Sequence, residues 1–161
     1  MKQTTQFLNI NTSYDHGRDL AVKQVVECRV DNAVYLPKRA NATDAGADLR
    51  STEKCEIYPG ETKMIDTGVA VKIPQGFGGF VFNRSGQGKN GIIVLNGVGV
   101  IDSDYRGNIK IALKNISENR YGIEVGDRIA QLVILPVILC DFVDSWNDTE
   151  RGTGGFGSTG K

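Results

Sequence analysis

The sequence has one histidine, three cysteines and no excess of either charge. His16 lies in a polar N-terminal stretch, which excludes Ser-His-Asp and Cys-His catalysis and argues against a zinc site. Cys28, Cys55 and Cys140 form no C-x-x-C pair, so buried free thiols are expected. Basic and acidic residues both number 19, so no net field favours nucleic acid or a membrane surface. No direct binding to nucleic acid is therefore expected.

Long apolar runs are also missing. The longest, from Ile129 to Cys140, is interrupted by Gln131 and Pro136 and is too short to span a bilayer. The first residues contain no apolar stretch of signal-peptide length. We therefore expect no membrane partner, and a cytoplasmic location, or a nuclear one in a eukaryotic or viral setting.

Helical periodicity is absent as well, because no long window sustains an apolar repeat of about 3.6 residues. Apolar and polar residues instead alternate in residues 26–31, 69–73 and 108–114. Turn signals such as Tyr58-Pro-Gly60 and Asn96-Gly97 separate these runs. The sequence predicts an all-β subunit, a jelly roll or distorted β-barrel with at most one short helix.

The 161 residues suffice for one domain with two unlike ends. Residues 1–24 are polar and aperiodic, which predicts a partly loose extension. Residues 25–150 carry the alternating pattern and form the expected β domain. Residues 151–161 hold five glycines, so this tail is expected to be mobile on its own.

The tail nevertheless carries groups that suit a nucleotide. Arg151 offers a planar fork for a phosphate, and Phe156 offers a stacking face for a ring. Ser158 and Thr159 add hydroxyl donors beside bare glycine N–H groups. These are the parts of a lid that closes over a nucleotide.

Elsewhere the available chemistry rests on carboxylates, arginines and a hydroxyl. The available groups are Asp48, Asp102, Arg84, Arg151 and Ser85. This set suits a phosphate ester or anhydride substrate with Mg²⁺, which prefers carboxylate, water and phosphate oxygens.

Five turn-rich segments follow one another along the chain. They are Asp44-Ala-Gly-Ala-Asp48-Leu49, Arg84-Ser85-Gly86, Asn96-Gly-Val-Gly99-Val-Ile-Asp102-Ser-Asp-Tyr105-Arg106-Gly107, Gly126-Asp-Arg-Ile-Ala-Gln131-Leu132, and Arg151 to Gly160. In this order they resemble the five motifs of the trimeric deoxyuridine triphosphate nucleotidohydrolases (dUTPases). The chain departs from that pattern at Asn83, where the family commonly has proline, and at Gly88-Lys89-Asn90, which should weaken the family's short helix.

The resemblance implies Mg²⁺-dependent hydrolysis of dUTP to dUMP and pyrophosphate by water attack on the α-phosphorus. This reaction limits uracil incorporation into DNA and supplies dUMP for dTMP synthesis. The resemblance also implies a homotrimer with shared active sites. Each site would take the first, second and fourth motifs from one subunit, the third from another, and the tail from the third.

Three residues carry the catalytic roles that the resemblance implies. Asp102 would activate the attacking water, and Ser85 would contact the oxygen that bridges the α- and β-phosphates. Arg151 would neutralise the γ-phosphate. Asp48 would hold Mg²⁺ through its water ligands.

The remaining implied roles concern substrate binding. A hairpin from Asn96 to Tyr105 would read uracil by its backbone, with Tyr105 beneath the deoxyribose and Phe156 over the base. Arg84 and Gln131 would contact the phosphate chain. The complete implied substrate-binding set is Arg84, Ser85, Gly86, Asn96, Gly99, Val100, Ile101, Tyr105, Gln131, Arg151, Phe156, Gly157, Ser158 and Thr159.

Each role has a structural alternative. Asp102 could cap a turn, Asp44 and Asp127 read as turn residues, Arg128 as an internal ion-pair partner, and Gln131 as a hydrogen-bonded strand residue.

Two other functions also stay open. One is the dCTP deaminase branch of the same fold, although the chain carries Tyr-Arg-Gly and the full glycine tail. The other is a nucleotide-gated interaction module.

Overall fold

The structure of the protein, a computed structural model, describes residues 25–150 and 152–154. The expected N-terminal extension, residues 1–24, lies outside this part. So do Arg151, Phe156, Gly157, Ser158 and Thr159 of the expected lid.

Short strands dominate the described residues, which contain one α-helix and one 3₁₀ turn. The elements are β1 (Glu27–Val30), η1 (Ala33–Tyr35), β2 (Ala47–Arg50), β3 (Cys55–Ile57), β4 (Thr62–Asp66), β5 (Val69–Lys72), β6 (Phe77–Phe82), α1 (Ser85–Lys89), β7 (Ile92–Val94), β8 (Gly99–Ile101), β9 (Lys110–Asn115), β10 (Tyr121–Ile123) and β11 (Arg128–Pro136). The prediction of an all-β fold with at most one short helix is confirmed.

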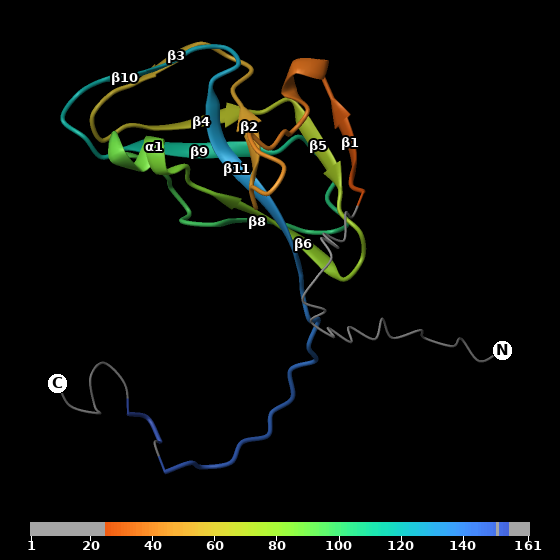
Figure 1. Cartoon of the computed structure of the whole chain (residues 1–161). Helices are drawn as coiled ribbons and strands as arrows, with labels where there is room; N and C mark the ends of the chain where they lie inside the picture. Colours follow the sequence, from red (N-terminus) through yellow and green to blue (C-terminus); the bar gives the residue numbers. More distant parts are fainter. Residues whose placement is uncertain (1–24, 151, 155–161) are drawn as a thin grey trace.

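The strands pair antiparallel in four sheets. The largest has the order β2-β11-β6-β8, and a second has the order β4-β9-β7. The pairs β1-β5 and β3-β10 complete the fold. In Figure 1, β11 runs across the middle of the molecule in blue, and β3 and β10 form a ribbon at one end. Because β11 pairs with both β2 and β6, it joins segments that are distant in the sequence.

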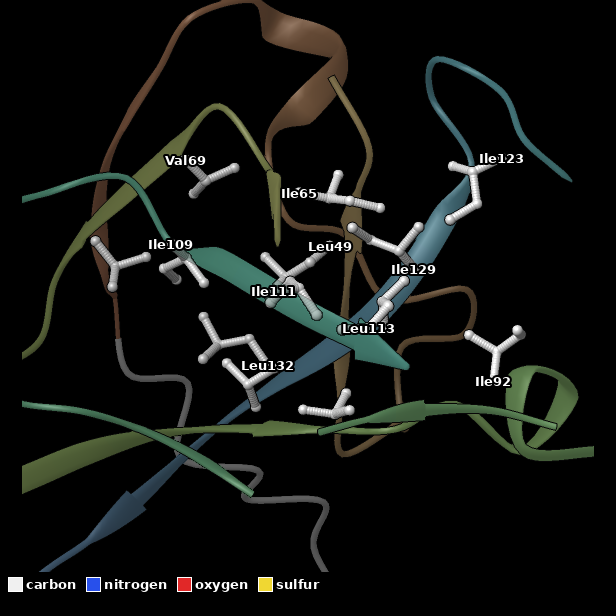
Figure 2. Close-up of a cluster of buried hydrophobic side chains, with 14 of the residues drawn as sticks. Leu49, Ile65, Val69, Ile92, Ile109, Ile111, Leu113, Ile123, Ile129 and Leu132 are labelled. Atoms are coloured by element: carbon white, nitrogen blue, oxygen red, sulfur yellow. The ribbon is translucent and has the colours of Figure 1, made fainter. Parts of the chain in front are cut away.

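The core follows from alternation along the strands. In β9, Ile111 and Leu113 are buried while Lys110 faces solvent, as a period of two requires. Figure 2 shows these side chains meeting Ile129 and Leu132 of β11. Burying an aliphatic side chain of this size contributes about 1.5–3 kcal/mol before entropy is counted. The cluster therefore fixes β11 and, with it, the residues that β11 carries.

The cysteines only partly match expectation. All three are free, and Cys28 and Cys55 are half-buried, where burial raises the pKa of each thiol. Cys140 is exposed, so the prediction that it is buried was wrong. The reason is that β11 ends at Pro136, before the apolar run itself ends.

An extended arm, residues 137–150, follows β11 and leaves the body of the molecule (Figure 1, lower half). Its large apolar side chains are almost fully exposed in the single chain, with Phe142 at 97% and Trp146 at 88%. Ile138, Leu139 and Val143 are exposed too. An exposed apolar surface of this extent is typical of a site that contacts another molecule, not of ordinary protein surface. Within the described residues, no helix has the length and apolar content that crossing a bilayer requires.

Candidate active site

One carboxylate lies between two arginines. Arg84 Nε approaches Asp48 Oδ1 at 2.8 Å, and Arg128 Nη1 approaches Asp48 Oδ2 at 3.2 Å. The Asp48 side chain is only 14% exposed, so these pairs are better shielded than surface ion pairs. The sheet explains the meeting: Asp48 lies on β2 opposite Gln131 of β11, Arg128 begins β11, and Arg84 follows β6.

These residues surround a hollow of about 330 Å³, called here the charged hollow. Its walls are Ala40, Asp44, Ala45, Gly46, Asp48, Arg84, Ser85, Arg128 and Gln131. The first, second and fourth of the five sequence segments thus meet at one place. Four of the expected site residues are in the wall: Asp48, Arg84, Ser85 and Gln131. Beside the carboxylates of Asp44 and Asp48, the hollow presents two guanidinium groups, a hydroxyl and an amide, donors that suit phosphate oxygens.

Gln131 is fixed within this wall. Its Nε2 donates to the carbonyl of Asn83 at 2.9 Å. Gly46 faces it so closely that a Cβ there would collide with Gln131 Oε1. Glycine at position 46 therefore leaves room for the Gln131 amide, a requirement that the sequence did not reveal.

The short helix α1 closes one side of the charged hollow. Ser85 is its first residue, and Arg84 is its N-cap, without a side-chain capping bond. Gln87 is its one buried residue, 5% exposed, and donates from Nε2 to the carbonyl of Arg128 at 3.1 Å. Arg84 Nη1 reaches the same carbonyl at 3.3 Å. The helix is short, as its glycines suggested, yet side-chain bonds attach it to β11.

The segment of residues 96–107 is built differently from the expected hairpin. β7 pairs with β9 in one sheet, and β8 pairs with β6 in another. The turn between them is closed by the bond from Gly97 N–H to the Val94 carbonyl, 3.0 Å. Between Asn96 and Tyr105 the structure has one strand, β8, which pairs with β6 and not with another part of this segment, and the chain changes sheets at the turn before it. A second hollow, about 210 Å³, borders Asn96, Gly99, Val100 and Ile101, together with Met64, Val81, Val94, Lys110, Ile111 and Ala112.

Asp102 and Tyr105 lie beyond β8, away from the charged hollow. Asp102 is exposed, and its carbonyl accepts from the Tyr105 N–H at 3.2 Å in a tight turn. The Tyr105 hydroxyl donates to the Asn108 carbonyl at 3.0 Å. Gly107 leaves room for the phenol, since a Cβ there would collide with it. The Tyr105 side chain is therefore fixed by its own bond, while Asp102 is placed by its backbone on the same exposed face.

The distance between this exposed face and the charged hollow follows from the pairing of β8 with β6. Ile101 pairs with Gly79 near the start of β6, whereas Arg84 follows the end of β6. Each residue of an extended strand adds about 3.4 Å, so the five residues from Gly79 to Arg84 span roughly 17 Å. Asp102, next to Ile101, therefore lies well away from Arg84 of the same chain.

The structural alternatives are partly confirmed. The Asp44 carboxylate accepts the Asn41 N–H at 2.8 Å, and Asp127 accepts the Glu124 N–H at 2.9 Å, so both close turns. Arg128 is an ion-pair partner of Asp48, although its side chain also lines the charged hollow. Among residues 25–150 and 152–154, no group of three or more His, Cys, Asp or Glu side chains could by itself hold a metal ion.

Comparison with known proteins identifies the family. The family model described as dUTPase matches residues 32–160, well over half of the chain. A deoxyuridine 5'-triphosphate nucleotidohydrolase of Corynebacterium glutamicum is 47% identical over 147 residues, covering 89% of this chain and 97% of that protein. Its counterpart in Haemophilus influenzae is 44% identical, covering 86% and 95%. The chain therefore belongs to the dUTPase family.

Solved structures agree with this assignment. The dUTPase of Staphylococcus bacteriophage 80alpha, solved with dUPNHPP, superposes with a TM-score of 0.76 at 32% identity, covering 86% of this chain and 100% of that chain. A mutant dUTPase from phage phi11 of S. aureus, described for the coordination of a structural Mg(II) ion, gives a TM-score of 0.70 at 28% identity, covering 77% and 98%.

Two residues of the site were not singled out from the sequence. Gln87 lies in a five-residue helix, which is too short to show an apolar period that would mark its buried side. Gly46 belongs to the first of the five segments, but nothing in the sequence indicated why a glycine stands there. Only the contact with Gln131 reveals what it is for.

Proposed function

We propose that the protein hydrolyses dUTP to dUMP and pyrophosphate, with water attacking the α-phosphorus. The observation that carries the proposal is the charged hollow, where three of the five family segments place two arginines, a serine and a glutamine around one carboxylate. Phosphoryl transfer depends on positioning and charge neutralisation more than on covalent chemistry, and this wall supplies both.

In this proposal the hollow binds the phosphate chain. Arg84 neutralises charge on the triphosphate while its ion pair with Asp48 keeps it oriented. The Ser85 hydroxyl donates a hydrogen bond to the oxygen between the α- and β-phosphates, where negative charge grows as the bond breaks. Gln131, held by Asn83 and by the close approach of Gly46, orients its amide toward the α-phosphate.

Mg²⁺ fits this wall as an ion that the triphosphate brings with it. Each Asp48 oxygen contacts one arginine, and a carboxylate oxygen has a second lone-pair direction to spare. Asp48 would therefore accept hydrogen bonds from water on the metal rather than bind the metal directly. The bound ion supplies charge neutralisation on the phosphate oxygens.

The water-activating base in the proposal is Asp102 of a neighbouring subunit. The roughly 17 Å along β6 from Gly79, which pairs with the neighbouring Ile101, to Arg84 supports a site completed by a second copy. The exposed apolar arm of residues 137–150 supports an assembly in which arms cover neighbouring subunits. A homotrimer with shared active sites accounts for both observations.

A further group of residues in the proposed site would bind the base and the sugar. Backbone groups of Asn96, Gly99, Val100 and Ile101 would read uracil, and Tyr105 would lie beneath the deoxyribose and exclude a 2′-hydroxyl. The fixed Tyr105 hydroxyl supports this, because a phenol anchored at its far end presents a rigid face.

The tail completes the proposal. Arg151 would neutralise the γ-phosphate, and Phe156 would stack on uracil, with Gly157, Ser158 and Thr159 adding polar contacts. Gly86, in α1, would add a contact from the second segment. Truncation after Glu150 should abolish hydrolysis while dUMP binding persists.

Arg151→Ala should cost roughly 10³-fold in turnover. Phe156→Ala should cost less, since base–aromatic stacking contributes about 1–3 kcal/mol. Full activity of the truncated protein would contradict the lid.

One assay tests the function. The protein is incubated with each dNTP and with UTP in the presence of Mg²⁺, and pyrophosphate and ammonia are both measured. Pyrophosphate from dUTP alone is expected, and a chelator should remove it. Ammonia from dCTP would instead indicate the deaminase branch, and no product from any nucleotide would favour an interaction module.

A further inference from the structure

We infer that Gln87 is a positioning residue, whose side-chain amide holds the Arg128 carbonyl and thereby sets Arg84 and Arg128 at the two oxygens of Asp48. The inference rests on the proposed function, because it assigns Gln87 to the binding of the triphosphate. It concerns a residue that lines no part of the charged hollow and touches no phosphate itself.

Two side chains share the carbonyl of Arg128. Gln87 Nε2 donates to it at 3.1 Å, and Arg84 Nη1 donates at 3.3 Å, which occupies both lone pairs of that oxygen. Arg84 uses its Nε on Asp48 Oδ1 at the same time. The Arg128 peptide is thus a fixed point to which both the helix α1 and the Arg84 guanidinium are attached.

The strand β11 is irregular beside Arg128. The ladder between β11 and β2 shifts register between Arg128 and Ala130. Bulges of this kind redirect side chains and leave the local backbone less constrained by the ladder. A side-chain bond to the Arg128 carbonyl therefore has more influence here than it would in a regular strand. Because the Arg128 side chain pairs with Asp48 Oδ2, a shift of this peptide moves one wall of the hollow.

Gln87 differs from an apolar residue of the same length in its buried amide group. Gln87 is 5% exposed, and its Oε1 meets no hydrogen-bond partner among the described residues. A buried acceptor without a partner is unfavourable for stability. A methionine of the same length would fill the space without that unfavourable oxygen. What glutamine offers at this position is its donor, and the donor reaches only the Arg128 carbonyl.

The test separates positioning from folding with the variant Gln87→Met. Binding of the non-hydrolysable analogue dUpNHpp with Mg²⁺, binding of dUMP, and the thermal midpoint are measured on the full chain. We expect the Kd for dUpNHpp to rise about three- to tenfold, the range for one lost hydrogen bond. The Kd for dUMP should change less than twofold, and the midpoint should not fall. Lys89→Met, an exposed position of the same helix, is the matched control and should alter none of the three.

A double-mutant cycle tests whether Gln87 acts through Arg84. In the background of Arg84→Ala, Gln87→Met should cost less dUpNHpp affinity than it does alone, because only its effect through Arg128 remains; an equal cost in both backgrounds would exclude action through Arg84. Gln87→Leu is measured in parallel, so that one poorly folded variant leaves the other. Equal weakening of dUMP and dUpNHpp, unchanged affinity for both, or unfolding of both variants would overturn the inference. If the unmodified protein binds no dUpNHpp, the proposed function fails instead.

Discussion

The charged hollow and the 96–107 segment are built in opposite ways. The hollow is held by side chains. Two ion pairs to Asp48 and hydrogen bonds donated by the side-chain amides of Gln131 and Gln87 fix its wall within one chain. The 96–107 segment is held mainly by its backbone, through pairing of β8 with β6 and a tight turn at Asp102. Asp102 and Tyr105 lie on its exposed face, although the Tyr105 hydroxyl is hydrogen-bonded to the Asn108 carbonyl.

This difference indicates which of the two regions needs a neighbouring subunit. Side chains that have satisfied one another need only a ligand, whereas exposed functional side chains need a second surface to form a site. We therefore expect the hollow to be largely formed in one chain and the 96–107 segment to act on a neighbour's hollow. The following predictions test that division.

The largest effect is expected from Asp102→Asn. Asparagine keeps the shape of the side chain but does not accept a proton, so kcat should fall at least about 10²-fold. The Kd for dUpNHpp should stay within a few-fold of the unmodified value, because the hollow is unchanged. Pyrophosphate release and calorimetry measure the two quantities. Near-normal turnover would remove Asp102 from its role.

Mixing two inactive variants tests whether sites are shared. Arg84→Ala damages the hollow and Asp102→Asn damages the segment, and each alone should have little activity. After co-refolding at equal amounts, about one site in four should combine an intact hollow with an intact segment, if subunits mix at random. Activity should return to that fraction of normal. A mixture as inactive as its components would place the whole site within one chain.

A smaller effect is expected from Tyr105→Ala. Removal of the anchored phenol should open space beneath the sugar and reduce the preference for dUTP over UTP about tenfold, the range for one steric contact. Tyr105→Phe is the matched control, because it loses only the bond to the Asn108 carbonyl and should keep the preference. The ratio of kcat/KM values for dUTP and UTP decides the matter. An unchanged ratio in Tyr105→Ala would contradict the steric role.

The smallest effect is expected from Gly46→Ala. The new methyl group would displace the flexible end of Gln131, so kcat/KM should fall a few-fold, about 1 kcal/mol or less. The thermal midpoint should change little. Gly122→Ala, where an added methyl meets nothing, is the control and should keep normal kinetics. A loss of stability without a kinetic effect would mean that the Gly46 contact serves folding alone.

Local patterns predicted much of this structure. Alternation marked β1, β5 and β9, because period-two sequences report which face of a strand is buried. Turn signals identified Asp127, which closes its own turn. The five motifs indicated which residues belong to the site by resemblance, without indicating how they meet.

What escaped prediction depends on contacts between distant segments. The pairing of β8 with β6 is decided by sheet assembly, which a three-residue strand does not encode. Cys140 was misjudged because apolar residues continue past the end of β11 into the arm. The bond of Gln87 to Arg128 joins a helix and a strand that are far apart in the sequence.

The placement of the 96–107 segment across the sheet from the charged hollow has a consequence for how new specificities arise. Under the proposed function, one edge of the sheet recognises what all nucleoside triphosphates share, and another recognises what distinguishes them. Substitutions in the turn before β8 leave the Asp48 network untouched, since no bond links the two among the described residues. Directed evolution toward a different base is therefore best confined to residues 95–98, with the arginines and Asp48 kept fixed.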